Sequence, residues 1–214
     1  MKSFLIIGMG HFGHHLCKAF AKLKCDIMIA DQDAQLLEDM LPYVVSAKAG
    51  DCTNEDVLRS FGVEQFDACF VCIGGNFQNS LQITSLLKEL GARKVYSKAD
   101  EDVQAKFLLR NGADEIIYPE LEAAANIAFS ASNDNVFDSI TLSNDYLICE
   151  IMPRKQWLGK SIVELNFRAE WKLSIMAVKK GSDVKFMPDA GYRFKEDEHI
   201  IVLGHKDDVN RATK

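Results

Sequence analysis

The sequence predicts an α/β protein in which a doubly wound parallel sheet is followed by a second, small α+β domain. The first apolar run, residues 4–7, leads directly into a G-x-G-x-x-G turn over 8–13, and Asp31 follows the second apolar run. Short apolar runs then alternate with helix-period segments as far as residue 119, which is typical of βαβ units. From residue 146 the apolar runs follow one another, separated by Gly, Pro and Asp turns. The first part is therefore predicted to be a Rossmann-like domain.

Each glycine of the turn meets a different physical requirement. Gly8 makes the tight turn after the first strand, Gly10 lets the backbone approach a phosphate, and Gly13 lets the helix pack closely on the strand. The helix that begins here directs unpaired N–H groups and the positive end of its dipole toward a ligand. The turn is therefore predicted to bind the phosphates of a nucleotide.

Asp31 stands at the end of the second strand, eighteen residues beyond Gly13. An acid at this place accepts hydrogen bonds from ribose hydroxyls and repels a 2′-phosphate. We therefore expect the protein to bind NADP poorly.

Six strands and five intervening helices make the first domain a complete doubly wound unit. The strands are predicted at 3–7, 26–30, 44–48, 68–73, 94–98 and 115–118. Polar residues mark two helix starts, because 53–56 reads as a capping sequence and Asp33 opens the segment after the second strand.

The domain boundary is predicted after residue 133. A helix is expected from 120 to about 132, and the helix-breaking residues 132–135 place a hinge at its end. A connecting segment over 136–144 then leads to strands at 146–151, 173–179, 184–186 and 199–204. The second domain, 134–214, is close to the lower size limit for independent stability, so we expect it to dimerise.

Composition and charge exclude several classes of protein. The formal net charge of −6 argues against a nucleic-acid-binding protein, which needs cations to neutralise phosphates. The opening apolar run has only four residues, so neither a signal peptide nor direct insertion into a membrane is expected, and a cytoplasmic location is predicted. Residues 144–214 hold 13 basic and 11 acidic residues, against 12 and 20 before them, so the second domain is the better place for another anionic ligand.

The cysteines and histidines are predicted to be structural. Cys69 and Cys72 form a C-x-x-C pair, but residues three apart in a strand point to opposite faces, and a redox pair needs a helix N-terminus. His11 and His15 have the i,i+4 spacing of a metal pair, but His11 is expected in the turn before the helix. Neither a redox nor a metal site is therefore predicted from these residues.

Beyond these patterns, several short motifs are spread along almost the whole chain. They are Gly8-Met9-Gly10-His11-Phe12-Gly13, Asp31, Ala49-Gly50-Asp51-Cys52-Thr53, Ile73-Gly74-Gly75-Asn76, Ser97-Lys98-Ala99, Gly112-Ala113-Asp114, Tyr118-Pro119-Glu120 and Ile201-Val202-Leu203-Gly204-His205. In these motifs the sequence resembles the RCK family, regulators of potassium conductance with TrkA-N and TrkA-C domains that include subunits of Trk and Ktr potassium-uptake systems.

The resemblance implies a nucleotide-binding N-terminal domain, a crossover helix that embraces a neighbouring subunit, and a C-terminal domain that forms homodimers. Family members assemble into rings of eight subunits on the cytoplasmic face of an integral-membrane potassium channel or transporter. By position, Asp31 would bind ribose, Asp51 the adenine edge, Asn76 the ribose-phosphate region and Lys98 a phosphate, while Glu120 would coordinate a divalent cation between subunits. The implied nucleotide-binding set is Gly8, Met9, Gly10, His11, Phe12, Gly13, Asp31, Gln32, Asp51, Cys52, Ile73, Gly74, Asn76, Lys98 and Glu120.

The identity of the nucleotide stays open. ATP-responsive relatives commonly carry arginine where this chain has His11, and histidine cannot supply the same fork of donors. ATP, ADP, AMP and NAD(H) are therefore all candidates. Some relatives bind cyclic di-AMP between C-terminal domains, and Arg168 is the candidate phosphate contact for it here. Simpler roles also remain, because Asp51 can cap the following helix and Glu120 can be a first-turn acid.

The leading hypothesis is a gating subunit rather than an enzyme, in which nucleotides stabilise different shapes of the ring. The alternative is a small NAD-dependent oxidoreductase, but no tyrosine of the chain belongs to a Tyr-x-x-x-Lys pair and no other proton donor is evident. A passive scaffold with a vestigial nucleotide fold is the third interpretation. The presence of Asp31, Asn76 and Lys98 argues against it.

Overall fold

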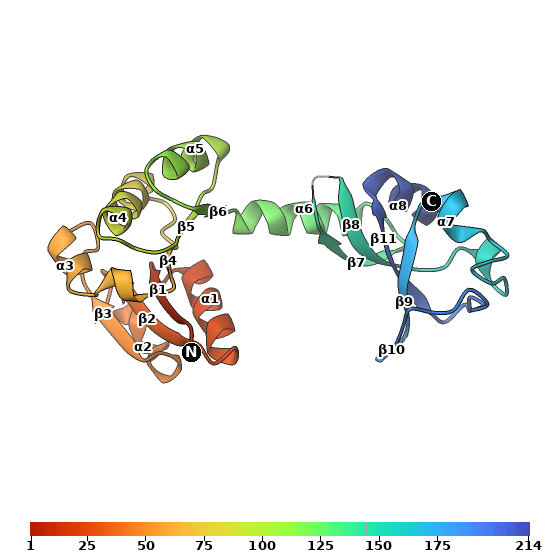
Figure 1. The fold of residues 1–214 in the computed structure, drawn as a ribbon, viewed down its shortest axis with the longest axis horizontal. Coiled ribbons are helices and arrows are strands. Elements are labelled where there is room, and N and C mark those ends of the chain that lie inside the picture. Colours follow the sequence, from red (N-terminus) through yellow and green to blue (C-terminus); the bar gives the residue numbers. More distant parts are fainter. Residues whose placement is uncertain (144) are drawn as a thin grey trace. The chain divides into compact units, whose positions relative to one another are not determined.

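The computed structural model describes residues 1–143 and 145–214 and divides the chain into two compact units, Met1–Leu121 and Glu122–Lys214 (Figure 1). The division falls near the start of helix α6 (Pro119–Ala131), whereas our sequence-based boundary lies just after that helix ends. Within the described ranges, no helix combines the length and the apolar character needed to cross a membrane.

The first unit contains a six-stranded parallel sheet in the order β3-β2-β1-β4-β5-β6. This order confirms the doubly wound, Rossmann-like fold. All six predicted strands are present, as β1 (Ser3–Ile7), β2 (Asp26–Asp31), β3 (Ser46–Ala49), β4 (Ala68–Val71), β5 (Val95–Lys98) and β6 (Glu115–Ile117).

Alternate residues of each strand point to opposite sides of the sheet, so both faces of the sheet are apolar. The apolar sides of helices cover both of them. Leu5 and Ile7 of β1 pack in one cluster with residues of α3 (Glu55–Arg59) and α4 (Phe77–Glu89). Phe4 and Ile6 pack in another with residues of α1 (His11–Lys22) and α2 (Gln35–Glu38). Figure 1 shows α1 on one side of the strands and α3 and α4 on the other. The last helix of the unit is α5 (Asp102–Arg110), and two 3₁₀ turns are η1 (Leu41–Tyr43) and η2 (Val63–Gln65).

Two strands are shorter than the apolar pattern predicted. β3 begins at Ser46 rather than at residue 44, because Val44 still ends the η1 turn. β4 ends at Val71 rather than at residue 73, since its neighbour β1 ends at Ile7, opposite Val71. β3 therefore starts after the turn that precedes it, and β4 ends together with the neighbouring strand β1.

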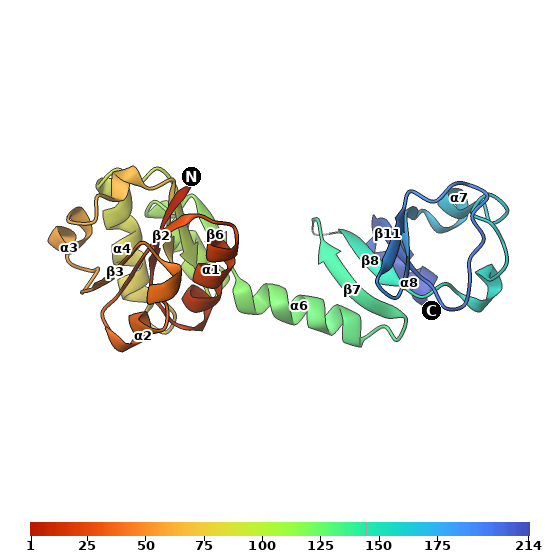
Figure 2. The ribbon, with the colours of Figure 1, turned by 90° about the horizontal axis from the view of Figure 1, so that it is seen from below.

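The second unit begins with most of α6, which leads into a five-stranded antiparallel sheet in the order β10-β9-β11-β8-β7 (Figure 2). Four of its strands match the predicted ones: β8 (Tyr146–Ile151), β9 (Ser174–Lys180), β10 (Asp183–Phe186) and β11 (His199–His205). The fifth, β7 (Val136–Thr141), replaces most of the connecting segment that we predicted over 136–144, of which residue 144 lies outside the described residues.

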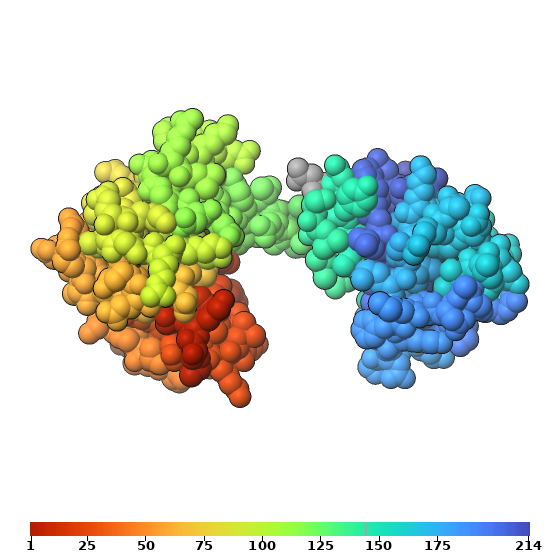
Figure 3. Space-filling view, in the orientation of Figure 1, coloured from red at the N-terminus to blue at the C-terminus, as the bar shows by residue number. Residues whose placement is uncertain are grey.

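The core of this unit contains a cluster of aromatic side chains among aliphatic ones such as Leu147, Ile151 and Ile200. Trp157, Phe167 and Phe194 are fully buried and contact one another in edge or tilted arrangements. They come from three short elements or loops, since Trp157 ends η3 (Lys155–Trp157) and Phe167 begins α7 (Phe167–Trp171). The final helix is α8 (Lys206–Thr213). Every residue of β10 is exposed (Figure 3), whereas β9 contributes the buried residues Ala177 and Val178.

Candidate nucleotide-binding site

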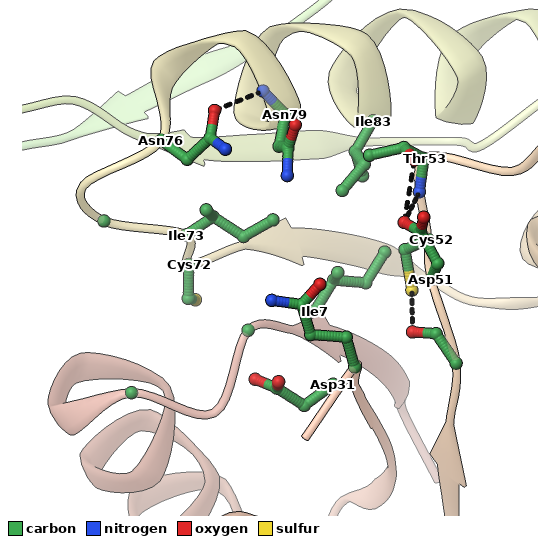
Figure 4. Close-up of a pocket in the computed structure, with 15 residues that line it drawn as sticks. Ile7, Asp31, Asp51, Cys52, Thr53, Cys72, Ile73, Asn76, Asn79 and Ile83 are labelled. Carbon is green, nitrogen blue, oxygen red and sulfur yellow. Dashed lines mark hydrogen bonds between the residues drawn. The ribbon is translucent and has the colours of Figure 1, made fainter. Parts of the chain in front are cut away.

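A cavity of about 240 Å³ lies in the first unit where the carboxyl ends of β1 and β4 meet (Figure 4). The strand order reverses between these two neighbours, and the crevice at such a point is where open α/β sheets bind ligands. The residues that line it are Ile7, Gly8, Gly10, Asp31, Gln32, Gly50, Asp51, Cys52, Thr53, Cys72, Ile73, Gly74, Asn76, Asn79 and Ile83.

The three glycines of the turn differ in what surrounds them. Gly8 has a φ of +93°, a conformation that side chains rarely adopt. A Cβ on Gly13 would lie 2.0 Å from the carbonyl oxygen of Gly8, so only glycine allows α1 to pack this closely on the turn. A Cβ on Gly10 would meet nothing within 4 Å, which leaves the backbone at Gly10 open to an approaching group. The geometry matches the separate requirements that the sequence predicted.

Asp31 connects the end of β2 to the glycine turn. Its Oδ2 accepts a hydrogen bond of 2.6 Å from the backbone N–H of Met9, and its Oδ1 accepts one of 2.9 Å from the N–H of Asp33. Each oxygen of an ionised carboxylate can accept a further hydrogen bond. Asp31 therefore holds the turn in place and keeps acceptor capacity for hydroxyl groups in the cavity.

Asp51 lies in the loop after β3 and also lines the cavity. Its Oδ1 accepts hydrogen bonds from the Thr53 hydroxyl (2.7 Å) and from the Thr53 backbone N–H (2.9 Å). These two bonds, that of the hydroxyl first, lower the pKa of Asp51. The helix cap of α3 is supplied by Asn54 instead, whose Oδ1 accepts from the N–H of Asp56. The simpler role suggested for Asp51, capping the following helix, is thus filled by its neighbour.

Asn76 is the N-cap of α4. Its Oδ1 accepts a hydrogen bond of 3.1 Å from the N–H of Asn79, which satisfies one of the free donors at the start of the helix. Asn79 and Ile83 lie one and two turns further along the same helix and face the cavity with it (Figure 4). The side-chain oxygen of Asn76 thus accepts one hydrogen bond, and its amide nitrogen is a donor available to the cavity.

Lys98 and Glu120 do not line the cavity. The Lys98 ammonium lies 2.8 Å from Glu120 Oε1 and 3.3 Å from Asp100 Oδ1. Burial alone would lower the pKa of Lys98, but the hydrogen bonds to Glu120 and Asp100 outweigh it and raise the pKa, while the Lys98 hydrogen bond lowers the pKa of Glu120. Only 11% of the Lys98 side chain is exposed, against 68% for Glu120. A Cβ on the cavity residue Gly74 would come within 3.4 Å of Lys98 Nζ, so the ammonium lies just behind the cavity wall.

The remaining predicted residues fall into two groups. Gln32, Cys52 and Ile73 line the cavity. The other predicted residues in the lining are Gly8, Gly10, Asp31, Asp51, Gly74 and Asn76. Met9, Phe12 and His11 do not line it, because Met9 and Phe12 pack in the apolar core and His11 is exposed. His11 is the first residue of α1, not part of the preceding turn as expected from the sequence.

Sequence reasoning missed six residues of the lining: Ile7, Gly50, Thr53, Cys72, Asn79 and Ile83. Four of them directly adjoin predicted residues. Asn79 and Ile83 stand three and seven positions after Asn76, the spacing of one helix face, so the phase of α4 would have identified them.

The C-x-x-C cysteines are buried on opposite faces of the sheet, as predicted, with Cys69 in one core cluster and Cys72 in the other. Burial raises the pKa of each thiol to about 12. All six cysteines are free. Among the residues that the structure describes, no three His, Cys, Asp or Glu side chains gather in a way that could hold a metal ion.

A second predicted contact, Arg168, lies in the C-terminal unit. It lines a hollow of about 190 Å³ together with Ile162, Phe167, Leu173, Ser174, Ile175, Pro188 and Ala190. Arg168 is the charged residue of this otherwise apolar set.

Comparison with known proteins gives matches over both units. The model of the TrkA-N domain matches residues 4–119, and that of the TrkA-C domain matches residues 150–214. The chain is 34% identical to the Ktr system potassium uptake protein C of Bacillus subtilis (strain 168), covering 100% of this chain and 96% of the relative. It is also 34% identical to the Ktr system potassium uptake protein A of the same strain, covering 98% and 95%. Among solved structures, the GsuK channel bound to NAD has a similar fold, with a TM-score of 0.65 and 15% identity over 97% of this chain and 38% of that one.

Proposed function

Because this chain belongs to the RCK family of potassium-transport regulators, with a TrkA-N and a TrkA-C domain, we propose that it senses an adenine nucleotide and passes the signal to a membrane partner. The chain is a regulatory subunit of potassium transport, like the Ktr proteins to which it is similar along almost its whole length. The nature of the signal and the way it is read are the proposed part.

The observation that carries nucleotide sensing is the position of Asp31. Its carboxylate is bonded to the glycine turn at Met9 and at the same time lines the cavity at the switch point of the sheet. A ribose placed there would meet this acceptor, and the phosphates would meet the open backbone at Gly10 and the start of α1. An adenine nucleotide, NAD(H), ATP, ADP or AMP, satisfies these requirements, whereas the 2′-phosphate of NADP would meet the Asp31 charge.

Lys98 gives the site a means of response. A phosphate at the cavity wall near Gly74 would compete with Glu120 for the ammonium of Lys98. Glu120 is the second residue of α6, the helix that leads out of the first unit. Release of its carboxylate on ligand binding would therefore change the contacts at the start of that helix. The freed Glu120 is also our candidate ligand for a divalent cation, with the other ligands supplied by a second subunit.

We propose that the subunit works in the cytoplasm as a homodimer that assembles into an octameric ring on an integral-membrane channel or transporter. The exposed apolar residues of α6, Leu121 and Ile127, are suited to the embrace of a neighbouring subunit that the family resemblance implies. Two nucleotides act differently on such a ring only if each binds its two shapes with unequal affinity.

Sensing rather than catalysis agrees with the chemistry of the lining. The ionisable side chains among the described cavity residues are two carboxylates and the thiols of Cys52 and Cys72. Burial raises the pKa of both thiols to about 12, so they exchange protons poorly near neutral pH. An oxidoreductase would consume NADH with a carbonyl substrate, and we expect no such consumption.

A cyclic dinucleotide is proposed as a second ligand, at the hollow lined by Arg168. The guanidinium offers paired donors to a phosphate, and the apolar residues around it offer contact area to a base. Arg168→Ala should abolish binding of cyclic di-AMP and leave nucleotide binding at the first unit unchanged.

The proposal is tested by calorimetric titration of the nucleotide-stripped full chain with ATP, ADP, AMP, NADH and NADPH. We expect tight binding of at least one adenine nucleotide, weak binding of NADPH, and loss of binding in Asp31→Ala. The matched control is Asp33→Ala, because the Asp33 carboxylate accepts a hydrogen bond from the N–H of Gln35 and lies outside the cavity. Absence of binding by all five compounds would refute the sensor function of this cavity.

A further inference from the structure

The C-terminal unit contains a larger cavity that none of the functions above uses. It has a volume of about 370 Å³ and is lined by Arg154, Gln156, Trp157, Lys160, Leu165, Glu170, Trp171 and Arg211. We name it the tryptophan cavity, because both tryptophans of the chain belong to its lining. It shares no residue with the hollow around Arg168. Its residues come from η3 and the residue before it, from the loop between η3 and α7, and from α7 and α8, and the last two helices contact each other.

The lining carries an excess of positive charge. Arg154, Lys160 and Arg211 face a single lining carboxylate, that of Glu170. Arg211 is paired with Asp208 at 3.0 Å, whereas among the described residues no carboxylate lies within ion-pair distance of Arg154 or Lys160. Among the described residues, Arg154 and Lys160 thus have no ion-pair partner.

The two guanidinium groups are gathered over one aromatic ring. The central carbon of Arg154 lies 5.0 Å, and that of Arg211 5.6 Å, from the centre of the Trp171 ring. Arg154 Nη1 also donates to the backbone oxygen of Arg211 at 3.3 Å, and Arg211 Nη2 to that of Glu170 at 3.1 Å. Two like charges beside one ring repel each other, and an anion bound between them would reduce the repulsion.

Trp157 adds a donor that lacks an acceptor. Its side chain is 1% exposed, and its indole N–H has no hydrogen-bond partner among the described residues. Native proteins retain few buried donors without a partner. The cavity therefore combines two arginines, a lysine and an unpaired N–H, all of which are donors, so it suits a ligand made of acceptor oxygens.

A second cavity adjoins the first, since both include Arg154 and Gln156 in their linings. It adds Lys155 and Lys214 and no acidic side chain. We propose that the tryptophan cavity binds a phosphate-bearing anion, with the first phosphate between Arg154, Lys160 and Arg211 and room for a second phosphate toward Lys155. The ligand is either a soluble polyphosphate compound or a phosphate headgroup at a lipid surface, and the chemistry of recognition is the same for both.

The test uses the tryptophan fluorescence of the full chain. Trp157 and Trp171 are its two tryptophans, and both line the cavity. Inorganic pyrophosphate is titrated to about 10 mM at constant ionic strength, because salt screens such contacts. A second titration uses phosphatidylcholine vesicles with and without phosphatidic acid. We expect a saturable change in fluorescence with pyrophosphate if the ligand is soluble, or with the phosphatidic-acid vesicles alone if the ligand is a headgroup.

In either case the response should weaken about tenfold or more in Arg154→Gln and in Lys160→Gln. Lys160 is exposed, so its variant keeps the fold and the proposal stays testable if Arg154→Gln does not fold. Lys185→Gln is the matched control, since it removes the same charge from an exposed residue of β10 outside both cavities. The proposal is overturned if neither pyrophosphate nor the vesicles change the fluorescence, or if both lining variants respond like the parent chain.

Discussion

Asp31 and Met9 are joined by a 2.6 Å hydrogen bond from the Met9 backbone N–H to Asp31 Oδ2. The bond ties the end of β2 to the glycine turn after β1, so the residue predicted to recognise ribose also fixes the loop predicted to hold phosphate. A change at Asp31 should therefore affect both the affinity for nucleotides and the choice among them.

We expect Asp31→Asn to narrow the preference for NADH over NADPH by about tenfold, because the carboxylate charge that repels a 2′-phosphate is removed while one oxygen remains to accept from Met9. Calorimetric titration with the two cofactors measures the ratio. Asp51→Asn is the control, since it removes a charge from another lining residue of the same cavity. An unchanged ratio in Asp31→Asn would contradict the assignment of Asp31 to ribose.

Substitutions at the two glycines should have different effects: one at Gly13 should lower stability, and one at Gly10 should lower the affinity for nucleotide. Gly13→Ala places a Cβ 2.0 Å from the Gly8 carbonyl oxygen and should destabilise the first unit by about 3 kcal/mol or more. Gly10→Ala meets no protein atom within 4 Å, so its unfolding temperature should be close to that of the parent chain while its nucleotide affinity falls. Thermal unfolding and calorimetry on both variants check this. A Gly10→Ala chain that binds nucleotide normally would show that the ligand does not approach the backbone at Gly10.

Asn76 should have two separable roles, as the cap of α4 and as a donor to the ligand. Asn76→Ala removes the acceptor for the Asn79 N–H and should cost about 1 kcal/mol in stability. Asn76→Asp keeps the cap but adds a negative charge at the cavity, so stability should be retained and nucleotide affinity reduced. Denaturant unfolding and titration measure the two effects. Equal affinity in the Asp variant and the parent chain would limit Asn76 to the capping role.

Glu120→Gln should increase the affinity for a nucleotide whose phosphate reaches Lys98. The substitution removes one of the two carboxylates that hold the ammonium, and because Glu120 is largely exposed we expect a gain of at most about fivefold. Glu122→Gln is the control, because it is an exposed acid of the same helix with no ion pair among the described residues. A similar gain in both variants would assign the effect to general charge rather than to Lys98.

The stability of the second unit should depend on pH through Glu164. A hydrogen bond from Arg193, and then one from the Ser161 backbone N–H, lowers the pKa of Glu164 from 4.5 to about 2. A carboxyl group whose pKa is lower in the folded state stabilises the fold above its ordinary pKa and loses this contribution as the pH falls through the folded value. Thermal unfolding between pH 4.5 and 2 should therefore lose less stability in Glu164→Gln than in the parent chain. Glu196→Gln, an exposed acid without an ion pair among the described residues, should follow the parent chain, and a parallel course of all three curves would disprove the role of Glu164.

The glycine turn, Asp31 and the alternation of strands and helices were predictable because each leaves a local pattern in the sequence. The position of Lys98 was not predictable, because its ion pair with Glu120 joins residues 22 positions apart in the sequence. This ion pair competes with any phosphate for the ammonium. The edge strand β7 was missed for a different reason. It pairs on one side only and most of its residues are exposed, so the sequence shows no apolar alternation there.

The order of the parallel sheet also determines when the candidate site comes into existence during synthesis. β1 is the first strand made, but its pairing with β4 joins Ile7 to Val71, and the cavity lies where these two strands end. At about 5–20 residues per second, a ribosome needs several seconds to add the intervening chain, during which β1 lacks its neighbour β4. Since the lining residues lie between Ile7 and Ile83, a nucleotide can bind only after this part of the chain has been made, and it cannot assist the first steps of folding.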